Sequence, residues 1–361
     1  MCGIAGMLCW EQREACPEQL RSMIAMVHHR GPDAAEVYTD RQIGLAHARL
    51  SIIDLENGRQ PMQAADGGLV VSFNGEIYNY IELRDLLVAR GYRFRTQSDT
   101  EVILHAYAEY GERCVDHFNG QWAFAIWDRQ RQRLFLSRDR LGIRPLYFTQ
   151  TQGEFLFASE IKSLLAHPHV PRAIDPVGLN QLLTYWAPVA PTTLFRDIDV
   201  LPPGHNLTVE SNRDVCTRPY WQLDYETESN SNCRTADDWC DELRELLTDA
   251  TRLRLRADVP VGAYLSGGLD STITTTLAQQ FTGDRLKTFS VTFDDDEFDE
   301  SEHQRAVVSA LGVEHHALHC SYDDIARVFP SVVWHAEKPM LRTAPAPLQL
   351  LAELVHASEF K

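Results

Sequence analysis

The sequence lacks the patterns that mark several classes of protein. No apolar run approaches the length of a transmembrane helix, and the N-terminus has no basic-then-apolar secretory signal. Basic residues are outnumbered: 34 Lys and Arg against 51 Asp and Glu give a net charge of −17, which argues against nucleic acid or an anionic membrane as a partner. No Cys-x-x-Cys pair occurs among the eight cysteines, so we expect reduced thiols of a cytoplasmic protein and neither a disulfide framework nor a cysteine zinc site.

Length and composition indicate two globular domains. The 361 residues are 44% hydrophobic and 24% charged, which is ordinary for proteins with packed cores. We expect a first domain at 2–210 and a second at 236–361, because residues 211–235 turn polar, as linkers do. Many strands with few helices in the first predict two packed sheets with helices outside them, and alternating strands and helices in the second predict a doubly wound parallel sheet.

The residue after the initiator methionine is a cysteine. Removal of Met1 would leave Cys2 with a thiol and a free α-amino group, whose pKa values are roughly 8.5 and roughly 7.7–8.0. The amine can then take the proton of the thiol, and the thiolate can attack a substrate. A cysteine at this position is weak evidence on its own, since a chance cysteine is the more frequent explanation.

The first domain carries several motifs in a fixed order. They are Met-Cys-Gly-Ile-Ala-Gly at 1–6, His-Arg-Gly-Pro-Asp at 29–33, Arg-Leu-Ser-Ile-Ile at 49–53, Asn-Gly-Glu-Ile-Tyr-Asn at 74–79, Ser-Asp at 98–99 and Arg-Asp-Arg-Leu-Gly-Ile-Arg-Pro-Leu-Tyr at 138–147. Together they resemble the class II glutamine amidotransferase domain, the N-terminal-nucleophile (Ntn) hydrolase type. The resemblance implies an α+β fold, an αββα sandwich of two antiparallel sheets.

The resemblance implies a role for each matching residue. Cys2 would attack the side-chain amide of glutamine and release ammonia, while Asn74 and the N–H of Gly75 would stabilise the oxyanion. Arg49 would bind the α-carboxylate of glutamine, and Asp99 its α-ammonium. The other residues implied to line this site are Leu50, Ile52, Ile53 and Glu76.

Each of these residues also has a plain structural explanation. Taken alone, Arg49 would form a surface salt bridge, Asp99 would cap a helix, and Asn74-Gly75 would form a hairpin turn. The joint pattern favours the functional interpretation over these.

A glycine-rich turn opens the second domain. Ser266-Gly267-Gly268-Leu269-Asp270-Ser271 lies between an expected strand at 258–265 and an expected helix at 272–280. Such a turn offers free N–H groups and the positive end of the helix dipole to an anion. No Gly-Lys-Ser/Thr ends it, which excludes a Walker A loop. The segment resembles the pyrophosphate loop of the ATP pyrophosphatase superfamily, and a tight turn with a helix cap is the alternative.

The second resemblance implies ATP as a substrate and Mg²⁺ as a cofactor. The residues implied to contact ATP or its pyrophosphate are Tyr264, Ser266, Gly267, Gly268, Asp270, Ser271 and Val291. Asp270 would bind Mg²⁺ through the pyrophosphate. An acidic run at 294–300 is another candidate magnesium ligand, although a solvated loop is the simpler explanation.

A class II glutaminase domain followed by this loop resembles glutamine-hydrolysing asparagine synthetase of the B type. That family makes asparagine, glutamate, AMP and pyrophosphate from aspartate, ATP and glutamine, through a β-aspartyl-AMP. The family's second Ser/Thr-Gly-Glu/Asp-Gly motif has no match before Lys361, so we expect a truncated synthetase that keeps the glutaminase chemistry and loses synthesis. Glutamine, aspartate and ATP are the expected partners, and a homodimer is the candidate assembly.

Three alternatives stay open on the sequence. Another class II enzyme, such as an amidophosphoribosyl transferase or an aminosugar synthase, would have a different second domain, and residues 266–271 count against it. A related amidotransferase with another carboxylate acceptor fits the same motifs. A truncated paralogue that only binds or regulates is the third, and the presence of Cys2, Arg49, Asn74 and Asp99 counts against it.

Overall fold

The chain divides into unit 1 (Met1–Asp224) and unit 2 (Tyr225–Lys361). The computed structural model describes residues 1–11, 13–225 and 235–361. The domain limits expected from the sequence placed a linker at 211–235, but β12 (Val215–Pro219) still pairs with β11 (His205–Glu210) in a sheet of unit 1. Polar composition misled here, because an edge strand with a solvated face is polar too. Residues 226–234 of that segment lie outside the described residues.

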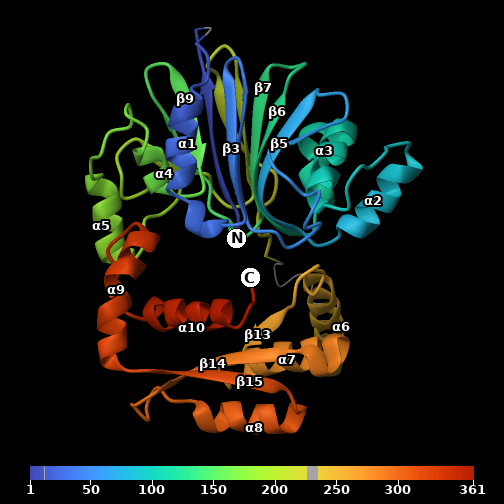
Figure 1. Cartoon of the computed structure of the whole chain (residues 1–361), viewed down its shortest axis with the longest axis vertical. Helices are drawn as coiled ribbons and strands as arrows, with labels where there is room; N and C mark the ends of the chain where they lie inside the picture. Colours follow the sequence, from blue (N-terminus) through green and yellow to red (C-terminus); the bar gives the residue numbers. More distant parts are fainter. Residues whose placement is uncertain (12, 226–234) are drawn as a thin grey trace. The chain divides into compact units, whose positions relative to one another are not determined.

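Unit 1 is built on two antiparallel sheets, as expected (Figure 1). The first sheet has the order β10 (Ile198–Val200), β8 (Tyr147–Gln150), β9 (Glu154–Ala158), β1 (Gly3–Cys9), β3 (Ile43–Arg49), β2 (Ala34–Asp40). The second has the order β12, β11, β7 (Arg133–Arg138), β6 (Gly120–Asp128), β5 (Leu69–Ile77), β4 (Met62–Gln63).

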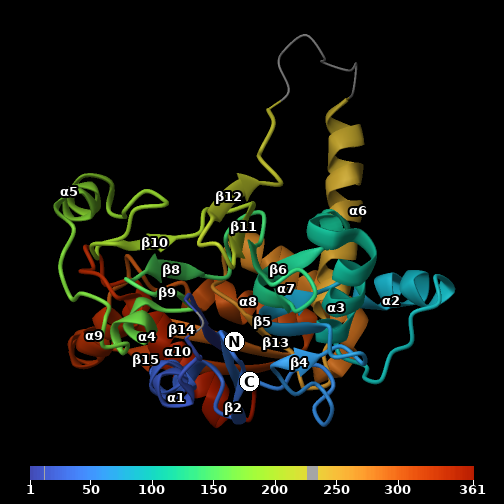
Figure 2. The same ribbon diagram turned by 90° about the horizontal axis from the view of Figure 1, so that it is seen from above.

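Helices cover the outer face of each sheet. Those beside the first sheet are α1 (Pro17–Ala25) and α4 (Ile161–Leu165), and those beside the second are α2 (Tyr80–Ala89) and α3 (Asp99–Tyr110). The view from above shows the two pairs on opposite sides of the sheets (Figure 2). Short 3₁₀ turns follow α1 and α3 at His28–Arg30 and Gly111–His117. The arrangement is the αββα sandwich that the sequence predicted.

Strand alternation sorts the side chains of unit 1 into layers. Along β6, Phe124 and Ile126 pack against the helices, whereas Ala123, Ala125 and Trp127 pack between the two sheets. This is the period of two that places successive strand residues on opposite faces. Both faces are apolar because both are covered.

The same alternation locates Asn74 and corrects one structural alternative. Asn74 and Gly75 do not form a hairpin turn: both lie inside β5, opposite Ala123 and Trp122 of β6. A Cβ on Gly75 would come 2.1 Å from the carbonyl oxygen of Gln121. Glycine is therefore required here by close strand approach rather than by a turn.

Unit 2 contains a parallel sheet of order β13 (Gly262–Tyr264), β14 (Lys287–Phe293), β15 (Glu314–Cys320) among the described residues. Its helices are α6 (Ala236–Arg254), α7 (Leu269–Thr282), α8 (Ser301–Leu311), α9 (Tyr322–Ala336) and α10 (Pro345–Ala357), with a 3₁₀ turn at Gly283–Arg285. Figure 1 shows α10 on one face of the sheet and α8 on the other. Helices on both faces of parallel strands confirm the α/β prediction.

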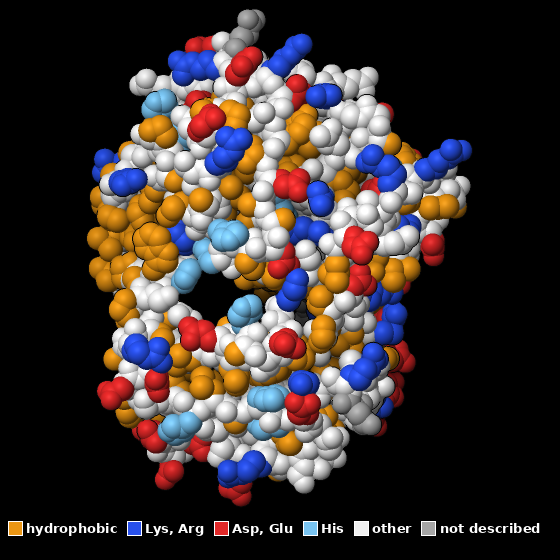
Figure 3. All heavy atoms as spheres, viewed as in Figure 1, with side chains coloured by type: hydrophobic (Ala, Val, Ile, Leu, Met, Phe, Trp, Pro, Cys, Tyr) orange, Lys and Arg blue, Asp and Glu red, His pale blue; other side chains and the backbone are white. Residues whose placement is uncertain are grey.

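One helix of unit 1 presents apolar side chains to the surface. Helix α5 (Pro176–Tyr185) and the residues after it expose Val177, Leu183, Tyr185 and Trp186, and hydrophobic side chains gather there in Figure 3. None of the helices in the described part of the chain is long and apolar enough to cross a bilayer.

The loop before α3 is fixed by a buried carboxylate. Glu101 accepts hydrogen bonds from the main-chain N–H groups of Arg95 and Thr96 at 3.0 and 2.7 Å. Burial alone would raise the pKa of Glu101, but the nearby His105 and the hydrogen bonds from Arg95 and Thr96 outweigh burial and lower the pKa to about 2. The ionised carboxylate thus holds residues 95–98 at the start of the helix that carries Asp99.

Replacing Glu101 by Gln should destabilise unit 1 at neutral pH. A glutamate whose pKa is about 2 in the folded state and about 4.3 in the unfolded state contributes roughly 3 kcal/mol to the free energy of unfolding at pH values above the unfolded-state pKa. This contribution is lost as the pH falls through the folded-state pKa. Urea unfolding followed by tryptophan fluorescence should show E101Q less stable at pH 7, with the difference vanishing towards pH 2. Glu109→Gln, a surface change on the same helix that removes only an ion pair with Arg90, should cost far less, because exposed ion pairs contribute little to stability. Parallel pH curves for E101Q and the parent would contradict the prediction.

Candidate functional site

A buried side-chain amide without partners marks one place in unit 1. Asn74 is 0% exposed, and neither its Oδ1 nor its Nδ2 has a hydrogen-bond partner in the described structure. Residues 70, 72 and 74 of β5 share the face towards the first sheet, as Val70 packs between the sheets and the Ser72 hydroxyl donates to the carbonyl of Ala46. An unpartnered buried amide is costly, so this one calls for a functional explanation.

The thiol of Cys2 lies at the start of β1, beside the end of β3. Its Sγ is 3.3 Å from the main-chain N of Leu50 and 3.6 Å from the Leu50 carbonyl oxygen. Burial raises the pKa of the Cys2 thiol, while the Leu50 hydrogen bond and the neighbouring amine and Arg49 lower it and Asp99 raises it. The Cys2 thiol is therefore close enough for the hydrogen bond of Leu50 and the charges of Arg49 and Asp99 to act on its pKa. All four residues were predicted to belong to this site.

A hydrogen bond from the Arg30 side chain to the main chain of Cys2 holds Cys2 in this position. The Nε of Arg30 donates to the Cys2 carbonyl at 2.9 Å, and its Nη1 donates to Glu160 at 2.8 Å. Lys162 also forms an ion pair with Glu160. Burial alone would raise the pKa of Glu160, but these cations and His29 lower it to about 2. No role was predicted for Arg30 from the sequence, although it belongs to the motif at 29–33.

Arg49 orders the loop that follows β3. Its guanidinium donates to the carbonyls of Leu55 at 3.0 Å and Asp54 at 2.6 Å, with a longer contact to Ile53 at 3.4 Å. It is only 7% exposed, which excludes the surface salt bridge considered from the sequence. An arginine has five N–H donors, so these carbonyls leave others for a ligand. Ile52 and Ile53 lie in the loop that Arg49 holds.

Asp99 lies at the free edge of β5. Its Oδ2 accepts a hydrogen bond from the main-chain N–H of Ile77 at 3.0 Å. Along the same edge, the side-chain oxygen of Gln60 accepts from the main-chain N–H of Phe73 at 2.7 Å. N–H groups two residues apart on a strand point to the same edge, so the Gly75 N–H points between these two acceptors. Burial raises the pKa of Asp99 to about 7, with the charge of Glu76 adding to it and hydrogen bonds from Ile77, Thr100 and Ser98 opposing it. The helix cap itself is Ser98, which accepts from Thr100.

Sequence reasoning missed the side chains that fix this edge. Gln60 is buried and joins Phe73 to the hydroxyl of Thr100, to which its Nε2 donates at 3.2 Å. On the inner side, His47 donates to the carbonyl of Phe73 at 3.0 Å, and burial lowers the pKa of His47 to about 4, so the ring is neutral. The two contacts fix the peptides on either side of Phe73, next to Asn74. Their partners are distant in sequence, and no motif pointed to them.

Arg144 is a further buried cation near Cys2 that the sequence did not single out. Its Nε is buried without a partner in the described structure. Burial lowers the pKa of Arg144, while Glu76 and Tyr78 raise it, and the charges of Arg30 and Cys2 also act on it. Arg144 could have been identified from the sequence by its position in the motif at 138–147.

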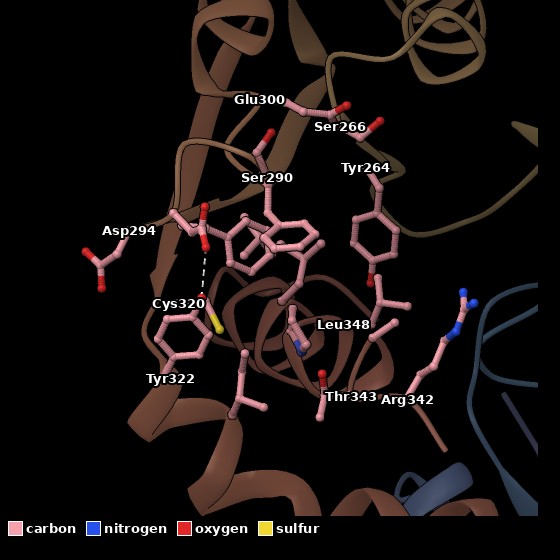
Figure 4. A pocket seen from close by; sticks show the side chains of 18 of the residues that line it. Tyr264, Ser266, Ser290, Asp294, Glu300, Cys320, Tyr322, Arg342, Thr343 and Leu348 are labelled. Atoms are coloured by element: carbon pink, nitrogen blue, oxygen red, sulfur yellow. Dashed lines mark hydrogen bonds between the residues drawn. The ribbon is translucent and has the colours of Figure 1, made fainter. Parts of the chain in front are cut away.

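Unit 2 has a cavity of about 830 Å³ at the carboxyl ends of its strands. Figure 4 shows Tyr264 and Ser266 on one side, Cys320 and Tyr322 on another, and Arg342 before α10. The carboxyl ends of parallel strands are where ligands of such sheets bind. Apolar residues dominate the lining: Phe289, Val291, Phe293, Ile325, Leu348 and Leu351.

The cavity contains only part of the predicted ATP set. Tyr264, Ser266 and Val291 line it. Gly267, Gly268, Asp270 and Ser271 belong to the adjoining loop and the first turn of α7, and Asp270 is exposed to solvent there. Asp294 and Asp295 of the acidic run also line the cavity, and Asp295 accepts from the Tyr322 hydroxyl at 3.0 Å.

The glycine-rich loop is held from inside and from α8. The Ser266 and Ser271 hydroxyls are 3.0 Å apart, and the main-chain N–H of Gly268 donates to Ser266 Oγ at 3.3 Å. Gly267 has a φ of +90°, and a Cβ there would come 2.9 Å from the Cβ of His303. Only glycine fits such a conformation at so close an approach. Gln304, which the sequence did not indicate, donates to the carbonyls of Ser266 at 3.4 Å and Val291 at 3.1 Å.

Comparison with known proteins assigns both units. A glutamine amidotransferase domain family matches residues 1–221, and an asparagine synthase family matches residues 242–361. A putative glutamine-hydrolysing asparagine synthetase 2 of Methanocaldococcus jannaschii is 32% identical over 379 residues, covering 98% of this chain and 72% of that protein. The chain belongs to the glutamine-hydrolysing asparagine synthetase family.

Other curated relatives are longer than the chain. Asparagine synthetase 1 of Bacillus subtilis is 36% identical over 356 residues, which cover 98% of this chain and 55% of the relative. Amidase chyE of Penicillium rubens is 35% identical over 387 residues, covering 100% of this chain and 57% of the relative. The chain thus spans about half the length of several curated relatives that it matches.

Asn74→Leu should leave the folded state as stable as before or stabilise it by about 1–2 kcal/mol, because it removes a buried amide without partners. Ser72→Ala is the matched control on the same face of β5. It removes the bond to the Ala46 carbonyl and should cost about 1 kcal/mol. Urea unfolding of the two variants measures both. A marked loss of stability in N74L would show that the Asn74 amide has structural partners and would contradict its availability for a ligand.

Proposed function

We propose that unit 1 hydrolyses glutamine to glutamate and ammonia, and that unit 2 is the nucleotide-binding part of a synthetase that activates the side-chain carboxylate of aspartate with ATP. The observation that carries the first part is the fully buried Asn74 amide, which has no partner in the described structure. It lies on the face of β5 towards the sheet that contains β1, the strand directly after Cys2. In this proposal the glutaminase domain runs through β12, and the synthetase domain contains α6 and the residues after it.

The nucleophile in this proposal is the Cys2 thiolate. Burial raises the pKa of the thiol, so a base must take its proton. Burial lowers the pKa of the α-amine of Met1, at this end of the chain, to about 6, so an amine in this environment is largely neutral and able to accept a proton at pH 7. After Met1 is removed, the amine of Cys2 itself would serve, directly or through a water molecule.

The oxyanion of the tetrahedral intermediate would be bound by Asn74 and Gly75. The backbone next to Asn74 is held before the substrate arrives, since His47 and Gln60 bond the peptides around Phe73. The Gly75 N–H points to the edge between Gln60 and Asp99. Donors that are oriented in advance stabilise developing charge without reorganisation in the transition state.

The amino-acid end of glutamine would bind between Arg49 and Asp99. The guanidinium suits a planar carboxylate, and Asp99 in its ionised form suits an ammonium. Leu50, Ile52, Ile53 and Glu76 line the site in this proposal, with Arg144 as a second cation near Glu76. An ammonium bound beside Asp99 would favour its ionised form and offset the cost of its burial.

In unit 2 the apolar cavity suits an adenine ring, and the loop Ser266–Ser271 suits the phosphates. Tyr264 and Val291 would contact the base. Gly268 precedes the first turn of α7, whose N–H groups would face the phosphates. Asp270 would hold Mg²⁺ through the pyrophosphate, and the magnesium, a homodimer and a cytoplasmic location stay predictions from the resemblance.

A different carboxylate acceptor is the second candidate, since amidase chyE matches the whole chain at an identity similar to that of the synthetases. Pyrophosphate release from ATP in the presence of aspartate, compared with other amino-acid and carboxylic-acid acceptors, separates the two candidates. Aspartate-dependent release supports the synthetase, and release that requires another acceptor supports the second candidate.

Ammonia release should depend on Cys2 and Asn74. Cys2→Ala should abolish hydrolysis of glutamine, and Asn74→Ala should lower kcat by about 10²–10³-fold, as loss of one oxyanion donor does, with a small change in KM. Cys16→Ser, a half-buried cysteine outside the site, is the control and should keep full activity. Mass spectrometry should find Cys2 as the first residue of the active protein. Full activity with Met1 retained, or in C2A, would refute the mechanism.

Glutamine binding should weaken in acid because of Asp99. With a pKa of about 7 the carboxyl is neutral below that pH and cannot pair with an ammonium. In the C2A variant, where no turnover occurs, the dissociation constant measured by calorimetry should rise roughly tenfold for each pH unit below 7. Asp99→Asn should bind glutamine weakly at every pH. A dissociation constant of C2A that stays flat between pH 5.5 and pH 8 would exclude this role of Asp99.

A further inference from the structure

A second group of chemically competent side chains lies at the other end of β1 from Cys2. Cys9 ends β1 and pairs with Glu154, the first residue of β9. From Cys2 to Cys9 an extended strand covers about 23 Å, so this group is remote from the proposed glutaminase site. His167 and His169 follow α4, which covers this face of the sheet. The proposed function uses none of these residues.

Three ligand atoms converge there. The Oε2 of Glu154 is 3.2 Å from Nε2 of His167 and 3.8 Å from Nδ1 of His169. All three atoms lie within 4.8 Å of one another. Donor atoms on a tetrahedral zinc ion, each about 2.0–2.1 Å from the metal, are roughly 3.3 Å apart, so only small movements separate this cluster from a metal site.

Two of the three atoms are buried without a hydrogen-bond partner in the described structure. They are Oε2 of Glu154, a residue 7% exposed, and Nε2 of His167, a residue 1% exposed. A simple ion pair would join them, but although they approach to 3.2 Å, their geometry forms no hydrogen bond. A buried carboxylate oxygen and a buried ring nitrogen without partners are costly, and a cation between them satisfies both.

We propose that Glu154, His167 and His169 bind a divalent transition-metal ion, with Zn²⁺ as the ion that this ligand set fits best. One carboxylate and two imidazoles form a common three-ligand zinc set, and such sets leave a fourth position to water. The His169 side chain is more than half exposed, so solvent reaches that position. This site is independent of glutamine and ATP.

One contact must give way for the metal to bind. The main-chain N–H of His169 is 3.4 Å from Nδ1 of His167, a long bond that requires Nδ1 without a proton. With the metal on Nε2, the ring proton moves to Nδ1 and this bond is lost. The exposed His169 can accommodate the change, because its side chain must also turn to bring Nδ1 closer to the ion.

A metal here would tie β9 to the segment after α4. The connection between β9 and α4, which such a tie would enclose, supports the start of β1, because the N–H of Ile4 donates to Oγ of Ser159 in this connection at 2.9 Å. The expected effect of the ion is therefore greater stability of unit 1, without a part in the chemistry at Cys2.

Calorimetry with Zn²⁺ on the metal-stripped full chain tests the site without reference to activity. We expect one ion per chain and a higher unfolding temperature with Zn²⁺. His169→Gln, at an exposed position that should not disturb folding, should weaken binding by at least about tenfold. Glu154→Gln should do the same. His316→Gln is the matched control, and this variant should bind Zn²⁺ as the parent does. His316 pairs with Glu314 at 2.8 Å, and no third ligand joins them among the described residues.

The absorption spectrum of the Co²⁺ form identifies the ligands. A spectrum of nitrogen and oxygen ligation, altered in H169Q, supports the proposal. A thiolate-to-cobalt band would place the metal on a cysteine and overturn it. Unchanged affinity in both H169Q and E154Q, or binding lost equally in H316Q, would also overturn it, whatever the result of the glutaminase assays.

Discussion

The position of one side-chain amide constrains unit 1. Asn74 stands in the middle of a paired strand, fully buried and without partners in the described structure. A sandwich of two sheets normally fills this layer with apolar side chains, as it does with Val70 and Trp127. Keeping an amide there requires that the strand cannot shift, because a slip of one residue would turn it to the other face.

Contacts from several neighbouring segments hold β5 in its register. One edge of the strand pairs with β6, and around Phe73 and Ile77 the other edge is closed by side chains: Gln60 and Asp99 accept from the two N–H groups. His47 bonds the carbonyl of Phe73 from the inner side. The ionised Glu101 orders the loop before Asp99 in turn. The geometry of the proposed oxyanion site therefore depends on contacts between segments that are distant in sequence.

Unit 2 places its proposed site by a different rule. A parallel sheet opens a cavity where its strands end, and the helix dipole of α7 adds a place for an anion next to it. The glycine-rich loop lies next to the cavity because Gly267 adopts a positive φ where it packs against α8. Gln304 of α8 also donates to one carbonyl of the loop, that of Ser266, and to one of β14, that of Val291. Asp294 and Asp295, first interpreted as a solvated loop, line the cavity, so their charge bears on any nucleotide that binds there.

The sequence by itself determined the two layers of sheets, the parallel strands of unit 2 and the motif residues, because period-two alternation, caps and glycine turns are local properties of a chain. It also indicated which residue types belong to the proposed glutaminase site. Only the tertiary structure decided that Asn74-Gly75 is strand rather than turn, that the sheet continues through β12, and that Gln60, His47, Arg30 and Arg144 support the site. It alone brought Glu154 to His167 and His169. These are contacts between distant segments, and hydrophobic periodicity carries no information about which segments meet.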